Sequence, residues 1–189
     1  GVAEIRESVT ELADNYDRGR CWREGALVVL AGQVNAGKSS LMNAILGVNR
    51  AIVTDIPGTT RDYLEESVQI DGLPVRLVDT AGLRAALDSV ELMGIERSRE
   101  LLARADLVLL VIDSELGPGA EDMDLAAQTT NLVVVANKID LVAGEPAWTG
   151  ETPWKDKEIC RLCAKHGQGI PALLAAIRTM IAAGGVPVE

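Results

Sequence analysis

The sequence contains no phenylalanine, and aromatic residues make up only 3% of its 189 residues. Hydrophobic residues still account for 48% of the chain, so a core must be built from Leu, Val, Ile and Ala. Such residues suit buried parallel strands covered by helices. No run of about 18 apolar residues occurs, so the sequence predicts no transmembrane helix. It also shows no signal peptide, and we expect a cytoplasmic protein that does not associate with a membrane.

Basic residues are scarce as well. The chain has 18 Lys and Arg against 28 Asp and Glu, which gives a net charge of -10. An acidic chain repels phosphate backbones, and this argues against a broad nucleic-acid-binding surface within these residues. A nucleic-acid partner would have to be held by another part of the protein.

Cysteine is sparse and odd in number, with only Cys21, Cys160 and Cys163. This set does not suggest a disulfide framework and favours a reducing compartment. The C-x-x-C spacing of Cys160 and Cys163 is compatible with a redox pair or half a metal site. Since no second pair exists and both lie in a short apolar run, buried structural cysteines are favoured. We interpret the single histidine, His166, as a solvated loop residue.

The hydrophobic pattern predicts strands that alternate with helices, which is typical of an α/β fold. Strands are expected at residues 26–31, 63–70, 75–78, 107–112, 132–136 and 157–162. Helices are expected at residues 38–46, 91–104, 119–128 and 169–182. The short connection 71–74 predicts a hairpin, and 141–156 reads as an irregular loop. We therefore expect a three-layer sandwich around a six-stranded, mostly parallel sheet with one antiparallel edge strand.

Residues 32–39 read Gly-Gln-Val-Asn-Ala-Gly-Lys-Ser and match the pattern G-x-x-x-x-G-K-[ST]. In this pattern the glycines let backbone N–H groups point at phosphate oxygens, and the following helix adds its positive end. Lys38 would bridge the β- and γ-phosphates, and the Ser39 hydroxyl would ligate Mg²⁺. The predicted strand before the loop and the helix after it make this phosphate-binding loop (P-loop) credible.

Two further segments complete the predicted phosphate site. Asp79-Thr80-Ala81-Gly82 follows a short strand, where Asp79 can reach Mg²⁺ through water and Gly82 can sense the γ-phosphate. Thr60, in the loop after the first helix, is the expected second hydroxyl ligand of Mg²⁺. It would ligate only when the triphosphate is bound, so this loop would order with GTP.

Asn137-Lys138-Ile139-Asp140 follows a predicted strand and identifies the base. The Asp140 carboxylate can accept two hydrogen bonds from guanine, whereas adenine would leave it unpaired. Asn137 would connect the base-binding segments, and the Lys138 stem would lie over the purine. Cys163-Ala164-Lys165 stands where GTPases usually have Ser-Ala-Lys, so the Ala164 N–H could bind guanine O6. Cys163 in place of Ser puts one loop hydrogen bond in doubt.

The route to hydrolysis is not evident from these motifs. Leu83 follows the D-x-x-G segment, where Ras-like enzymes place a water-orienting Gln. Leucine cannot orient a water. Arg61 and Arg84 lie near the phosphate segments, but neither is marked as an arginine finger.

Four stretches together look like the G domain of the MnmE (TrmE) family of bacterial tRNA-modification GTPases. They are residues 35–40, 51–62, 79–84 and 90–97, and the resemblance runs from about Arg23 to the last helix. The chain departs from the family at Val34, where Pro is common, and in a short 113–131 region.

The resemblance implies a P-loop GTPase fold and K⁺ in place of an arginine finger. Asn35 would ligate K⁺ together with backbone oxygens of Thr54, Ile56 and Thr59. Glu91 would position the attacking water, although the local sequence alone suggests a solvated carboxylate in the first turn of a helix. The implied catalytic set is Glu91, Lys38 and Thr60. The implied nucleotide-binding set is Asn35, Ala36, Gly37, Lys38, Ser39, Ser40, Thr54, Asp55, Ile56, Pro57, Gly58, Thr59, Thr60, Asp79, Thr80, Ala81, Gly82, Asn137, Lys138, Asp140, Cys163, Ala164 and Lys165.

The resemblance also implies pairing of two G domains, a flavin-dependent partner named MnmG (GidA), and tRNA. It implies a folate-binding N-terminal domain and a helical domain, neither of which lies in this chain. Residues 1–24 form an amphipathic stretch and linker that we interpret as a remnant of the helical domain. Residues 25–184 would be the G domain and 185–189 a tail.

Two other interpretations stay open at this stage. A ribosome-assembly GTPase of the Der or Era type shares several of these motifs, including Pro57-Gly58-Thr59-Thr60-Arg61-Asp62 in Der. The segments 82–84 and 90–97 favour MnmE over Der. A non-catalytic, GTP-dependent switch would be consistent with Leu83.

Overall fold

The computed structural model describes residues 20–21, 23–48, 65–80, 91–150, 153–154 and 157–183, with the backbone alone for 91–97. The amphipathic stretch 2–17 and the tail 185–189 lie outside these residues, so their predicted roles stay predictions. None of the helices in the described ranges is long and apolar enough to cross a bilayer.

Six strands form one sheet in the order β2-β3-β1-β4-β5-β6. Their bounds are β1 Ala26–Ala31, β2 Glu65–Ile70, β3 Leu73–Asp79, β4 Leu107–Asp113, β5 Leu132–Asn137 and β6 Glu158–Arg161. Among these six strands of the described residues, only β2 pairs in an antiparallel manner, with β3, and it lies at the edge. The predicted six-stranded, mostly parallel sheet with one antiparallel edge strand is therefore confirmed.

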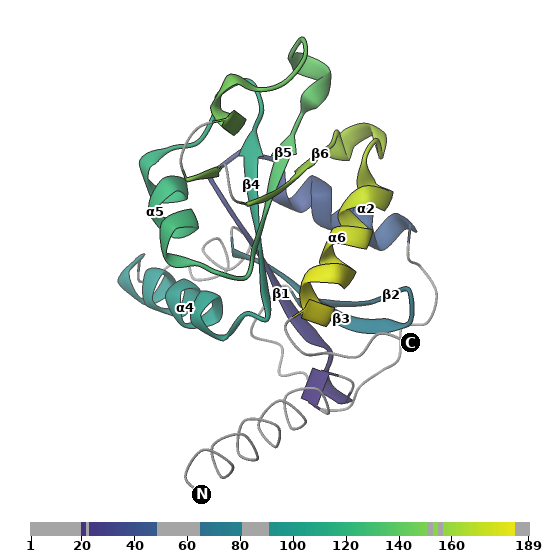
Figure 1. The fold of residues 1–189 in the computed structure, drawn as a ribbon. Coiled ribbons are helices and arrows are strands. Elements are labelled where there is room, and N and C mark those ends of the chain that lie inside the picture. Colours follow the sequence, from purple (N-terminus) through teal and green to yellow (C-terminus); the bar gives the residue numbers. More distant parts are fainter. Residues whose placement is uncertain are drawn as a thin grey trace, which may run out of the picture.

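Helices cover both faces of this sheet (Figure 1). One face carries α2 (Lys38–Val48) and α6 (Ile170–Ala183). The other carries α4 (Glu91–Arg104) and α5 (Ala120–Gln128). Strands β1, β4 and β5 are buried along their whole length, which matches their unbroken apolar runs. This is the predicted three-layer arrangement.

The hairpin between β2 and β3 is tighter than predicted. Its turn consists only of Asp71 and Gly72, with φ of 48° and 85°. Two central residues with positive φ are typical of a type I′ hairpin turn. Leu73 and Pro74 belong to β3 and pair with β2, so the expected four-residue connection was wrong. Pro74 is tolerated because the pairing of β3 with β1 begins only at Val75.

The segment 141–156, predicted as an irregular loop, contains the short 3-10 helix η2 (Ala147–Gly150), and η1 (Ile139–Leu141) ends at its first residue. Within it Trp154 is only 1% exposed and packs with strands β4 and β5 and helix α5. Trp148 contacts it edge-on, with ring centroids 5.7 Å apart. Among the core residues that the structure describes, this pair supplies the aromatic volume.

Strands β1, β3, β4 and β5 run in the same direction. Their carboxyl ends therefore meet at one edge of the sheet. Leu30 is in register with Asp79, and Asp113 with Asn137. In α/β sheets of this kind, ligands bind outside this edge, and the predicted motifs gather there.

Candidate nucleotide-binding site

The loop between β1 and α2 is shaped by two glycines. Gly32 has φ of 126°, and a Cβ there would lie 2.1 Å from the Val111 carbonyl oxygen. Gly37 has φ of 101°, and a Cβ there would lie 2.2 Å from the Asn137 Nδ2. Both positions therefore need glycine, for the backbone conformation and for the close approach of β4 and β5. Asn35 between them also has a positive φ, 65°, and its side chain is exposed.

The Lys38 side chain folds back over this loop. It is 5% exposed, and its ammonium donates hydrogen bonds to the carbonyl oxygens of Gly32 at 2.8 Å and Gln33 at 2.6 Å. The Lys38 ammonium is thus held against the backbone of the loop between β1 and α2. Such an arrangement is suited to binding phosphate oxygens.

Ser39 and Asp79 lie side by side, although they are 40 positions apart in the sequence. The Ser39 hydroxyl donates to Asp79 Oδ2 at 2.7 Å, and Asp79 is 2% exposed. A hydroxyl beside a buried carboxylate is a hard-oxygen donor pair that fits Mg²⁺. Thr80, next to Asp79, donates to the carbonyl oxygen of Leu30 and fixes this segment against β1.

Asn137 connects three segments of the site. Its Nδ2 donates to the Ala36 carbonyl at 2.8 Å, and its Oδ1 accepts from the Ala164 N–H at 3.0 Å. Asn137 is 2% exposed, so both hydrogen bonds are shielded from water. The P-loop, the end of β5 and the Cys163–Lys165 segment are held at fixed distances by one side chain.

The carboxylate predicted to bind the base is Asp140, in η1. A hydrogen bond from the Cys163 thiol lowers the pKa of Asp140, and the nearby His166 and Lys165 act in the same direction. Asp140 is therefore ionised at neutral pH and can only accept hydrogen bonds. Burial raises the pKa of Cys163, and its hydrogen bond to Asp140 adds to this. Cys163, which stands where GTPases usually have Ser, thus contacts the carboxylate predicted to bind the base.

Lys138 adopts a left-handed backbone conformation, with φ of 60° and ψ of 38°. Its ammonium pairs with Asp113 at 2.6 Å, at the end of neighbouring strand β4. Burial raises the pKa of Asp113, but the Lys138 ammonium and the N–H groups of Glu115 and Leu116 outweigh this and lower it overall. Asp113 thereby fixes the side chain expected to lie over the purine.

Sequence reasoning missed Asp113, and it also missed a contact beside the P-loop. Gln33 Nε2 donates to Asp122 Oδ2 at 3.0 Å, which links the loop to α5. The sequence could have indicated Asp113 as a site residue, because it ends an apolar strand just as Asp79 does. No comparable signal marked Gln33 or Asp122.

Several predicted residues lie outside the described part of the chain. They are Thr54, Asp55, Ile56, Pro57, Gly58, Thr59, Thr60, Ala81 and Gly82, together with Arg61, Leu83 and Arg84. Glu91 begins α4, but the structure describes only its backbone. The predicted K⁺ cage and the water-positioning carboxylate therefore stay predictions.

Curated relatives resemble the chain along nearly its whole length. The tRNA modification GTPase MnmE of Nitratidesulfovibrio vulgaris strain Hildenborough is 50% identical over 187 residues, which covers 96% of this chain and 40% of the relative. MnmE of Acetivibrio thermocellus is 39% identical over 190 residues and covers 100% of this chain and 41% of the relative. The chain thus spans about two fifths of the length of these relatives.

Solved structures share the fold at lower identity. An Era variant from Aquifex aeolicus bound to GDP and aluminium fluoride superposes with a TM-score of 0.62 at 24% identity, covering 86% of this chain and 57% of Era. The FeoB G-domain of Methanococcus jannaschii superposes with a TM-score of 0.58 at 22% identity, covering 83% of this chain and 98% of that domain. These two likenesses concern the fold alone.

The family described as 50S ribosome-binding GTPase matches residues 27–138, from the first strand through the first half of the base motif. This match spans more than half of the chain, and the relatives over the full length are MnmE proteins. The chain therefore belongs to this GTPase family, as a G domain of the MnmE type.

Proposed function

We propose that this chain binds GTP with Mg²⁺ at the carboxyl edge of its sheet, hydrolyses it with the help of K⁺, and acts within a tRNA-modification enzyme. The observation that carries the nucleotide site is the position of Asn137. It links the P-loop at Ala36 to the base segment at Ala164 through two buried hydrogen bonds. A nucleotide spans these two ends, with phosphates at one and the base at the other.

At the phosphate end, Lys38 would exchange its two loop carbonyl partners for phosphate oxygens. Ser39 would ligate Mg²⁺, Asp79 beside it would reach the ion through water, and Thr60 would be a further ligand in the triphosphate state. Bound there, Mg²⁺ supplies charge neutralisation at the β- and γ-phosphates. The protein contributes by holding the Lys38, Ser39 and Asp79 side chains in place before the nucleotide binds.

At the base end, the ionised Asp140 would accept from guanine N1–H and N2–H₂, and the Ala164 N–H would face O6. The Lys138 stem, held by Asp113, would cover the purine ring. The experiment that tests this end is Asp140→Asn. The amide can donate to the carbonyl that xanthine has at C2, so preference should move from GTP towards XTP. An unchanged preference would overturn the base assignment.

The K⁺ proposal rests on Asn35 and on the family resemblance. Asn35 is exposed at the P-loop with a left-handed backbone, so its amide oxygen is available to a cation beside the phosphates. K⁺ supplies positive charge where negative charge develops in the transition state. Thr54, Ile56 and Thr59 would complete its ligands, and Glu91 would position the attacking water.

The test of the K⁺ proposal is GTP turnover in KCl and in NaCl at equal ionic strength. We expect faster turnover in KCl, and we expect Asn35→Ala to remove the difference between the two salts. Equal turnover of the unaltered protein in both salts would exclude the K⁺ mechanism.

The wider role follows from the relatives, whose name describes tRNA modification. On the family resemblance we include in the proposal dimerisation through the G domain, a flavin-dependent MnmG partner, tRNA as the modified molecule, and a folate-binding domain elsewhere in the whole protein. The MnmE relatives reach 50% identity, whereas Era reaches 24%, and this favours MnmE over a ribosome-assembly role.

The domain boundaries belong to the same proposal. We assign residues 25–184 to the G domain and 1–24 to a linker from a helical domain. At the end of that linker, Arg20 pairs with Asp106 at 2.6 Å, and Cys21 is buried. The end of the linker therefore packs on the G domain.

A further inference from the structure

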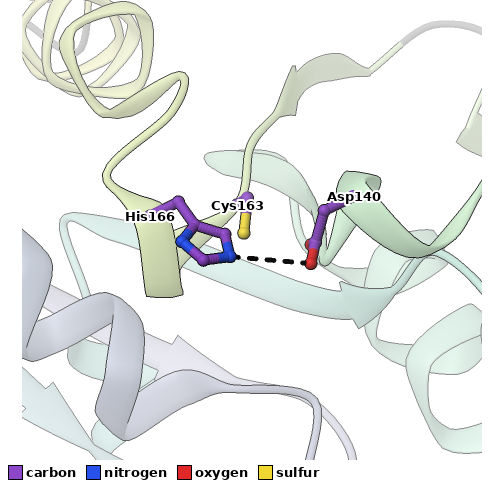
Figure 2. A group of neighbouring side chains, drawn as sticks. All are labelled: Asp140, Cys163 and His166. Atoms are coloured by element: carbon purple, nitrogen blue, oxygen red, sulfur yellow. Dashed lines mark ion pairs between the residues drawn. The ribbon is translucent and has the colours of Figure 1, made fainter.

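Three potential metal ligands of different types converge at the base end of the site (Figure 2). They are the Asp140 carboxylate, the Cys163 thiol and the His166 imidazole, and we call them the Asp-Cys-His cluster. Their ligand atoms all lie within 4.8 Å of one another, and Asp140 Oδ2 is 4.0 Å from His166 Nε2. The side chains point toward a common centre (Figure 2).

The backbone that carries the Asp-Cys-His cluster is held firmly. Ile139, beside Asp140, donates its N–H to the Leu162 carbonyl, which precedes Cys163. The Cys163 N–H donates to the Gln168 carbonyl at 3.0 Å, and the His166 N–H donates to the Cys163 carbonyl at 3.2 Å. Buried Cys163 is thus a fixed point, while the Asp140 and His166 side chains are 34% and 58% exposed and can rotate.

The chemistry of the Asp-Cys-His cluster differs from that of the proposed Mg²⁺ site. Ser39 and Asp79 offer oxygen alone, whereas the cluster offers sulfur, nitrogen and oxygen. A mixed set that includes thiolate and imidazole suits Zn²⁺ and similar transition metals. Tetrahedral Zn²⁺ at about 2.0–2.3 Å from each ligand needs ligand atoms roughly 3.3–3.8 Å apart. Side-chain rotations that move the ligand atoms of Asp140 and His166 by about 1 Å would bring the three ligand atoms to this separation.

We propose that the Asp-Cys-His cluster binds a divalent transition metal of the Zn²⁺ class, and that this metal and guanine exclude each other because both require the Asp140 carboxylate. Cys163 would bind as thiolate, releasing its proton to solvent as the sulfur–metal bond forms, and neutral His166 would bind through Nε2. Water would take the fourth position. The mutual exclusion rests on the proposed guanine site; the metal site rests on the cluster itself.

The charges of the Asp-Cys-His cluster support a cation. In the free protein the raised pKa of Cys163 keeps it a thiol, so Asp140 alone carries a negative charge. Once the metal displaces the thiol proton to solvent, Asp140 and the Cys163 thiolate would supply two negative charges, which match a divalent ion. Lys165 acts electrostatically on Asp140 and opposes the metal, but it carries only one positive charge. The serine usual at position 163 would remove the sulfur ligand, so the site is a consequence of the cysteine in this protein.

The first experiment is a Co²⁺ titration of the nucleotide-free protein, with Mg²⁺ in excess to fill the oxygen site. We expect a thiolate-to-cobalt absorption band that saturates at one equivalent and disappears on addition of Zn²⁺. The band should be lost in Cys163→Ser and kept in Cys160→Ser, a matched control because Cys160 is also buried and lies three positions away. No band in the unaltered protein, or a band that survives Cys163→Ser, would overturn the metal site.

The second experiment measures binding of fluorescent GDP with and without Zn²⁺. At a Zn²⁺ concentration ten times its own Kd, the apparent Kd for GDP should rise about elevenfold. His166→Ala should lose this rise; its side chain is exposed, so the variant does not threaten the fold. Zn²⁺ bound to the phosphates of GDP would act equally on both proteins, and an equal rise in both would overturn the proposal.

The two experiments separate the metal site from the guanine site. A cobalt band without any GDP binding would support the metal site and refute the guanine site, and with it mutual exclusion. Tight GDP binding without a cobalt band would leave the guanine site intact and refute the metal site. A cobalt band that GDP removes supports both parts of the proposal.

Discussion

Asn137→Ala is the substitution whose effect the structure defines best. The side chain is 2% exposed and makes two hydrogen bonds, from Nδ2 to the Ala36 carbonyl and to Oδ1 from the Ala164 N–H. The first of these connects residues 101 positions apart. Truncation removes both hydrogen bonds and leaves a buried carbonyl and a buried N–H without their partner.

The expected loss of stability follows from those two hydrogen bonds. Leaving a buried donor or acceptor unsatisfied costs about 1–3 kcal/mol. Two such groups give a range of about 2–6 kcal/mol, and because neighbouring losses do not add fully we expect about 3 kcal/mol. That is a large part of the roughly 5–15 kcal/mol by which ordinary domains are stable. GDP affinity should fall as well, since the P-loop and the Ala164 segment are no longer held together.

The assay is urea unfolding of the nucleotide-free protein, followed by GDP binding. Asn131→Ala is the matched control, because the Asn131 side chain is exposed and its amide donates a long, 3.4 Å hydrogen bond to the Asp106 carbonyl, while the backbone hydrogen bond from Val108 is kept in the variant. It should change stability by less than about 0.5 kcal/mol. Asn137→Asp keeps the side-chain volume but sets an oxygen against the Ala36 carbonyl, so it should destabilise comparably. If Asn137→Ala stays within about 0.5 kcal/mol of the unaltered protein, the reasoning is wrong.

Two further substitutions test the rest of the site. Glu91→Ala should lower GTP turnover and leave GTP affinity intact, whereas a large loss of affinity would indicate a structural role. Asp113→Asn should cost about 1–2 kcal/mol by removing the charge opposite Lys138, with exposed Asp124→Asn as its neutral control. Because folding lowers the pKa of Asp113 below 3.8, its contribution is complete above that pH and is lost as the pH falls through the folded value. The free energy of unfolding, measured against pH, should therefore differ less between Asp113→Asn and the unaltered protein as the solution becomes acidic. A difference that grows in acid would contradict the ion pair.

Unbroken apolar runs in the sequence were enough to predict the central strands of the core. Apolar runs at 107–112 and 132–136 correspond to β4 (Leu107–Asp113) and β5 (Leu132–Asn137), which are buried throughout. The hairpin turn was predicted too long, because Pro74 was read as part of a turn. Its place in β3 depends on where the pairing with β1 begins, and pairing register is not a local property.

Trp154 was equally beyond local reasoning. It lies among Gly, Pro and polar residues, which predicted an irregular loop, yet it is buried against β4, β5 and α5. The burial of one large side chain in a loop depends on a gap left by the rest of the core. No pattern within the loop itself contains that information.

The sequence by itself determined the order of the motifs and the type of fold. A buried strand, a glycine loop and a helix follow one another along the chain, and each depends on residues next to it. The tertiary structure decided which side chains meet: Asn137 with Ala36, Asp113 with Lys138, and the Asp-Cys-His cluster. The physical reason is that parallel strands bring their carboxyl ends to one edge. Residues far apart in the sequence thereby become neighbours, and their contacts depend on register, burial and side-chain direction.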